Sequence, residues 1–166
     1  MPSAILAVLW LSVAGQLTSQ TPADSINKEF LELQGTSWRV FAVDSYPAGP
    51  VAITQVQEVR QHTPPSTWGV FARNRSMEIV PSFRLAAAIV AGDGVVKSIQ
   101  QLPPVKNFKL RQDVRQELRI TVTTLLPTDR VVFFVDEVSR DEDGWKAKRT
   151  DVDTLIKSAA RRLPIP

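Results

Sequence analysis

The chain has no cysteine and only one histidine among its 166 residues. Without thiols it can form neither disulfide bonds nor thiolate metal sites, and no cysteine nucleophile is available. His62 stands beside the loop-forming pair Pro64 and Pro65, so we interpret it as an exposed loop residue. The sequence also lacks a glycine-rich phosphate loop and any paired nucleophile and base. These absences predict a protein that is not an enzyme and that needs no cofactor or metal ion.

A strong excess of charge of either sign is also lacking. Twenty Lys and Arg residues stand against 17 Asp and Glu residues, which leaves a formal net charge of +3. The basic residues are dispersed, and the spacing of Arg111, Arg115 and Arg119 is typical of a solvated face. We therefore expect no nucleic acid among the partners. The acidic run at 141–143 does not have the ligand spacing of a calcium loop and is interpreted as a solvated turn.

The first 20 residues carry no charged side chain. Their apolar centre, residues 4–14, has the length of the hydrophobic region of a signal peptide and is shorter than the ~20 residues of a membrane span. Val13-Ala14-Gly15 predicts cleavage after Gly15, with an end at residue 20 as the longer alternative, and residues 16–24 form a polar spacer. We therefore expect a secreted protein without a transmembrane segment. A buried N-terminal helix is the alternative interpretation of the same apolar run.

Hydrophobic periodicity predicts one β-rich domain over residues 25–163, followed by a tail at 164–166. The run at 130–138 is the most β-prone and is apolar on both faces in its first half, which is typical of a strand covered on both sides. The helix at the end of the domain has an apolar stripe and begins with acidic residues. The predicted elements are a helical turn at 25–33, strands at 35–43, 82–90, 95–99, 107–110, 117–125, 130–138 and 145–150, and a helix at 151–163.

The segment 51–75 gives mixed signals. Val51, Ile53, Gln55 and Gln57 do not alternate cleanly, and only 67–72 has the pattern of a short strand. Asn74-Arg75-Ser76 is an N-glycosylation sequon. In an exported protein it predicts a glycan on Asn74 in a surface turn.

Three motifs, in the right order along the chain, resemble those of the lipocalin family. Gly35-Thr36-Ser37-Trp38 is similar to the family's Gly-x-Trp start, with one extra residue. Thr128-Asp129-Arg130 is similar to its Thr-Asp-Tyr turn, with arginine in place of tyrosine, and Arg149-Thr150 is similar to its third motif. The resemblance covers residues 26–163, although the usual cysteines are absent. It implies an eight-stranded antiparallel up-and-down barrel with a short N-terminal helical turn and a C-terminal helix packed outside.

The resemblance also implies roles for individual residues. Gly35, Trp38 and Arg149 would close one end of the barrel, with the guanidinium stacked on the indole. Because neighbours in a strand point to opposite sides, we expect Phe134 to line the interior and Phe133 to face the C-terminal helix. The residues expected to bind a ligand inside the barrel are Trp38, Val40, Ala42, Phe83, Leu85, Ala87, Leu118, Ile120, Val122, Val132 and Phe134.

The function implied is secreted transport of a small hydrophobic ligand of the fatty acid, retinoid, steroid or odorant class. Two alternatives stay open. The same apolar residues could fill the core of a β-rich interaction module that holds no ligand. A cone-shaped α+β lipid-binding fold is the other alternative, although it needs a longer N-terminal helical region than 25–33.

Overall fold

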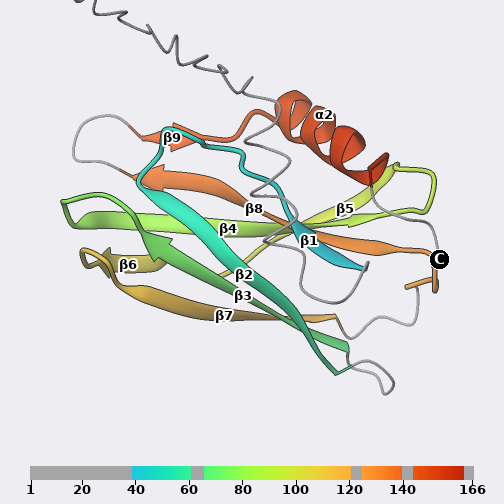
Figure 1. Cartoon of the computed structure of the whole chain (residues 1–166), viewed down its shortest axis with the longest axis horizontal. Coiled ribbons are helices and arrows are strands. Elements are labelled where there is room, and N and C mark those ends of the chain that lie inside the picture. Colours follow the sequence, from blue (N-terminus) through green and yellow to red (C-terminus); the bar gives the residue numbers. More distant parts are fainter. Residues whose placement is uncertain (1–38, 61–65, 121–124, 140–143, 163–166) are drawn as a thin grey trace, which may run out of the picture.

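The computed structural model describes residues 39–60, 66–120, 125–139 and 144–162. In these ranges the chain is mostly β, with one helix near its C-terminal end (Figure 1). The strands are β1 (Val40–Ala42), β2 (Val51–Arg60), β3 (Ser66–Asn74), β4 (Val80–Val90), β5 (Val96–Gln101), β6 (Val105–Phe108), β7 (Asp113–Ile120), β8 (Arg130–Ser139) and β9 (Trp145–Lys146), and the helix is α2 (Arg149–Ala160). No described helix is both long enough and apolar enough to cross a membrane.

The strands lie in two sheets. In sheet A the order is β1-β8-β4-β5, with β6 also paired to β4 and β9 paired to β8. Sheet B has the order β2-β3-β7. Sheet B packs on one face of sheet A, and α2 covers the other face (Figure 1). The described part of the protein therefore has three layers, with sheet A in the middle.

Strands β4 and β8 form the centre of sheet A and contribute to both apolar layers. Phe133 and Leu85 lie in the core between the two sheets, whereas Phe134 and Ala86 lie under α2. Alanine at 86 and 88 leaves room for the helix to approach the sheet closely. The prediction that the strand at 130–138 is covered on both sides is confirmed. The predicted hairpin of residues 82–90 and 95–99 is also confirmed, as β4 and β5.

The described strands do not form a closed barrel. Strand β1 runs parallel to β8, which differs from the antiparallel neighbours expected of an up-and-down barrel. After β1 the chain turns at Tyr46-Pro47-Ala48-Gly49-Pro50, where the N–H of Gly49 donates to the carbonyl of Tyr46. The next strand, β2, then pairs with β3 in sheet B rather than with β1. This crossing from one sheet to the other produces two packed layers instead of one continuous sheet.

Two irregularities account for patterns that the periodicity did not explain. In β2 the register shifts between Ile53 and Gln55, so Thr54 interrupts the alternation of that strand. In β8 the pairing with β4 passes from Val135 to Glu137 and leaves Asp136 without a partner on β4. The extra residue shifts the alternation of side chains between the two faces by one position. Val135 and Val138 therefore both point into the core between the sheets.

The ends of the domain differ from the prediction. The last strand is only two residues long, and α2 begins at Arg149, two residues earlier than expected. The signal peptide, the spacer, the helical turn at 25–33, Gly35, Trp38, Val122 and the tail at 164–166 lie outside the described residues.

Candidate functional site

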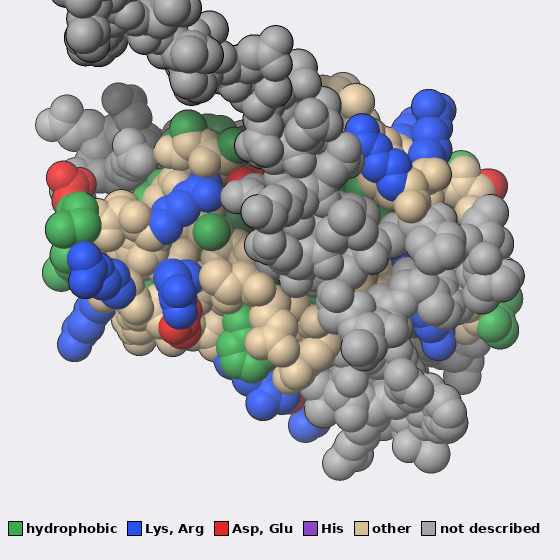
Figure 2. Space-filling model, in the orientation of Figure 1, with side chains coloured by type: hydrophobic (Ala, Val, Ile, Leu, Met, Phe, Trp, Pro, Cys, Tyr) green, Lys and Arg blue, Asp and Glu red, His purple; other side chains and the backbone are tan. Residues whose placement is uncertain are grey.

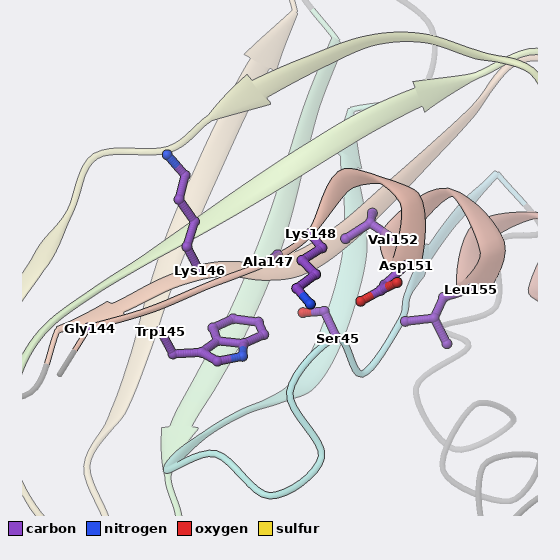
Figure 3. Close-up of a pocket in the computed structure, with 9 residues that line it drawn as sticks. All are labelled: Ser45, Gly144, Trp145, Lys146, Ala147, Lys148, Asp151, Val152 and Leu155. Carbon is purple, nitrogen blue, oxygen red and sulfur yellow. The ribbon is translucent and has the colours of Figure 1, made fainter.

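A groove of about 450 Å³ opens between the start of α2, β9 and the loop that follows β1. Its larger apolar side chains come from Trp145, Val152 and Leu155, and Ser45 lies on the side of the β1 loop. Figure 3 shows the side chain of Lys146 extending away from the other labelled residues. The full lining is Ser45, Gly144, Trp145, Lys146, Ala147, Lys148, Asp151, Val152 and Leu155.

The aromatic wall of the groove is held by a stacked pair. The rings of Tyr46 and Trp145 are nearly parallel, at 7°, with their centroids 4.0 Å apart. Glycine is required at position 49, because a Cβ there would lie 2.2 Å from Cδ1 of Tyr46. Arg75 fixes the same loop by donating to the carbonyl oxygens of Tyr46 and Pro47. The indole of Trp145 therefore packs against a loop of defined conformation.

The groove is joined to sheet A at the bulge in β8. The hydroxyl of Ser45 donates to the carbonyl of Val135 at 2.6 Å. The N–H of Ala147 donates to the carbonyl of Asp136 at 2.8 Å. The bulged residue has no partner on β4, so its carbonyl is available to the segment that leads into α2.

The side chain of Asp136 is fully buried and anchors the first turn of α2. Its Oδ2 accepts a hydrogen bond from Nε2 of Gln101 at 2.6 Å, and its Oδ1 lies 3.0 Å from Nη1 of Arg149. That second contact is an ion pair without hydrogen-bond geometry. The guanidinium carbon of Arg149 also lies 5.7 Å from the ring centre of Phe134. Arg149 thus makes a cation–π contact with Phe134. The partner expected for it, Trp38, lies outside the described residues.

The other end of α2 is anchored through the turn 128–130. Nη1 of Arg130 donates to the carbonyl of Ala160 at 3.1 Å, where the negative end of the helix dipole favours a cation. Burial lowers the pKa of Arg130. The carboxylate of Asp129 accepts from the N–H of Leu126 at 2.9 Å and from Nζ of Lys97 at 2.7 Å. These contacts fix the helix against sheet A at both ends and so fix the helical side of the groove.

The polar groups of the groove carry charges of both signs. Lys148 occupies the N-cap position of α2, and no side chain there accepts a hydrogen bond from the first turn. Its ammonium group and the first N–H groups of the helix both attract negative charge. Asp151 and Ser45 add a carboxylate and a hydroxyl. Together with the three apolar side chains, they suit a molecule with an apolar body and one polar end.

The residues predicted to bind a ligand fall into two separate layers. Phe134 and Val132 lie under α2, whereas Phe133 lies between the sheets, so the expected faces of Phe133 and Phe134 are exchanged. Both faces of β8 are apolar, so alternation alone could not assign either face to the interior. Ile120 lies in β7 opposite Ser66. The predicted residues that the structure does bring together between the sheets are Val40, Ala42, Phe83, Leu85, Ala87 and Leu118.

Asn74 is not in the exposed position expected of a glycan acceptor. The residue is 0% exposed, and its amide nitrogen donates to the carbonyls of Glu78 and Phe108, both at 2.9 Å. Its Oδ1 accepts from the N–H and the hydroxyl of Ser76. The expected exposure of Asn74 is therefore wrong, whereas its glycosylation stays a prediction; a glycan would replace one of the two N–H groups that donate these hydrogen bonds.

Sequence reasoning missed the groove and its anchor, Asp136. The available signal was the pair of carboxylates, Asp136 and Glu137, that interrupts the apolar run of β8, because a charge buried in such a strand needs a partner. In the described ranges no three or more His, Cys, Asp or Glu side chains could together hold a metal ion. Comparison with family models, curated proteins and solved structures finds no match to the chain. The resemblance to the lipocalin family therefore stays a prediction.

Proposed function

We propose that the protein is a non-enzymatic binding protein that carries a small amphipathic molecule in the groove between α2, β9 and the β1 loop. The observation that carries this proposal is the groove itself. Its volume of about 450 Å³ falls within the range typical of small-molecule sites. It places a fixed aromatic wall beside the polar side chains of Ser45, Lys148 and Asp151, and polar groups of this kind fix the orientation of a bound molecule.

The proposal places the ligand outside the core rather than inside a barrel. Phe83, Leu85 and Phe133 are almost completely buried and belong to one packed cluster between the sheets. A ligand inserted there would have to displace side-chain contacts, since protein interiors are packed as densely as organic crystals. In the groove, Trp145 and Leu155 are only partly buried, so a ligand can cover apolar surface that is otherwise open to water.

The ligand class proposed is a fatty acid or a comparable molecule with a single anionic group. Its apolar body would lie along Trp145, Val152 and Leu155, and its carboxylate would lie near Lys148. Secretion is part of the same proposal, and sequencing the N-terminus of protein recovered from the medium tests it. A new terminus at Gln16 supports export, and retention of Met1 on intracellular protein contradicts it.

The binding proposal is tested by titrating the full chain with fatty acids, retinoids and steroids while recording tryptophan fluorescence. We expect saturable binding of fatty acids and loss of most of the fluorescence change in Trp145→Phe. Leu155→Asp places a carboxylate on the apolar side of the groove and should weaken binding by about tenfold or more, since ~1.4 kcal/mol corresponds to that factor.

Leu126→Asp is the matched control, because Leu126 is an exposed leucine outside the groove. It should bind as the wild type does. If Leu155→Asp also binds normally, the groove is not the site. If no compound of the panel binds saturably, the interaction module without a ligand replaces the carrier as the proposed function.

A further inference from the structure

Two turns at one end of the protein expose large apolar side chains next to one another. Met77 and Ile79, in the turn between β3 and β4, are 72% and 56% exposed. Leu110, in the turn between β6 and β7, is 42% exposed. The amide of Asn74 joins the two turns, because it donates to Glu78 in one and to Phe108 at the start of the other. We call Met77, Ile79 and Leu110 the apolar tip.

Basic side chains flank the apolar tip. Lys109 and Arg111 stand on either side of Leu110 in the chain, and Lys106 lies on the adjoining strand β6. All three are exposed, and none pairs with a carboxylate among the described residues. Glu78 is the acidic residue of the same two turns. Figure 2 shows hydrophobic and basic side chains together at the left end of the molecule, where Figure 1 places these turns.

We infer that the apolar tip docks on an anionic lipid surface. The tip lies where two chain reversals end the sheets (Figure 1). Its side chains are open to solvent, since Met77, Ile79 and Leu110 are among the exposed large hydrophobic residues. A projecting set of apolar side chains can enter the boundary between headgroups and acyl chains, and flanking cations attract anionic lipid headgroups. A protein partner would need a cavity shaped to receive three side chains from two turns, whereas a bilayer adapts to them.

This inference goes beyond the proposed carrier function and does not depend on it. The tip belongs to turns of β3, β4, β6 and β7, whereas the groove is formed by α2, β9 and the β1 loop. Separate assays of vesicle binding and ligand binding can therefore distinguish a protein that only docks on membranes from one that only carries a ligand.

The test is co-sedimentation of the purified full chain with phosphatidylcholine vesicles that contain about 30% phosphatidylserine, compared with pure phosphatidylcholine vesicles. We expect binding only to the anionic vesicles. Binding should fall when salt is raised from about 0.1 to about 1 M, because the Debye length shortens from ~10 to ~3 Å. The double variant Ile79→Asp with Leu110→Asp should lower the bound fraction at least tenfold, an effect equivalent to ~1.4 kcal/mol.

A second double variant tests the contribution of the flanking positive charge, and a variant outside the apolar tip serves as the control. Lys109→Glu with Arg111→Glu should abolish the preference for anionic vesicles. Val95→Asp changes an apolar side chain that is 56% exposed in the β4–β5 turn and should leave binding unchanged. Because all these side chains are exposed, the variants should keep the wild-type thermal melt. Equal binding to both vesicle types, or binding unaffected by the tip variants, overturns the inference; so does capture of a protein partner without any vesicle binding.

Discussion

The buried amide of Asn74 gives the sharpest test of the packing. Its nitrogen donates to the carbonyls of Glu78 and Phe108, and its oxygen accepts two hydrogen bonds from Ser76. Both N–H donors and both acceptor positions of the amide are therefore used, in a side chain that is 0% exposed. Asn74→Asp keeps the size and shape of the side chain and replaces only the donating nitrogen by an oxygen. We expect this single atom to have a large effect.

The magnitude follows from the two hydrogen bonds that the variant cannot make as a carboxylate. The new oxygen faces two carbonyl oxygens that were each 2.9 Å from the amide nitrogen. The buried carbonyl of Phe108 loses this donor at a cost of ~1–3 kcal/mol, and burial of the new carboxylate adds to that cost, whereas the carbonyl of Glu78 still accepts from the hydroxyl of Ser76. We expect a fall of ~3–5 kcal/mol in the free energy of unfolding near neutral pH. Single domains have only ~5–15 kcal/mol in total.

The pH dependence of this loss has a definite sign. Burial beside two carbonyl oxygens favours the protonated form of the new carboxyl, which can still donate one hydrogen bond, so its pKa is raised in the folded state. The folded variant then binds more protons than the unfolded chain above the unfolded pKa of ~3.9, and stability falls as pH rises. Urea melts at about pH 7 and about pH 4.5 should therefore show a smaller loss at the lower pH.

The matched control is Asn107→Asp. Asn107 is exposed and has φ 52°, a conformation that asparagine and aspartate adopt more readily than most residues. Its stability should change by less than ~0.5 kcal/mol. If Asn74→Asp is as stable as the wild type near neutral pH, or if its loss does not depend on pH, the buried position of Asn74 and its hydrogen bonds are wrong.

Three further predictions concern arginine side chains and their partners. Arg149→Ala leaves the buried carboxylate of Asp136 without its cation and should cost ~1–3 kcal/mol; a double-mutant cycle with Asp136→Asn should show coupling, and additive effects would mean that the two do not interact. A second cycle with Trp38→Phe measures the closure that the lipocalin resemblance implies, and additivity there would count against it. The hydrogen bond from Arg73 lowers the pKa of Asp113. The pair therefore stabilises the fold above the unfolded pKa of ~3.9, and this stabilisation is lost as pH falls through the folded pKa of Asp113. In Arg73→Gln the NMR titration of Asp113 should shift to higher pH. An unchanged titration would contradict the pairing.

Local sequence patterns predicted the strands and the helix in which apolar residues recur at one regular spacing. Strands β4, β5 and β8 were recognised by alternation or continuous apolar character, and α2 by its apolar stripe. The segment that forms β2 gave mixed signals because the irregularity at Thr54 interrupts its alternation. The pairing of β1 with β8 and the crossing to sheet B depend on contacts between distant residues, which no local period encodes.

The candidate site was harder to predict than the strands. Phe133 and Phe134 are equally apolar neighbours, so their faces depend on which side of sheet A receives sheet B and which receives α2. The sequon around Asn74 has the composition of an exposed turn, and only the arrival of β6 buries it. The groove joins residues from the β1 loop to residues about 100 positions later, and the bulge at Asp136 that supports it leaves no mark in composition.

The most direct test of the proposed function is a map of amide chemical shifts in the full chain as a fatty acid such as oleate is added. The account predicts saturable changes concentrated at Ser45, at 144–148 and at 151–155. The core around Leu85 and Phe133 should be nearly unaffected, because its side chains already pack against one another. Changes centred on that inter-sheet core, or the absence of any saturable change, would contradict the account.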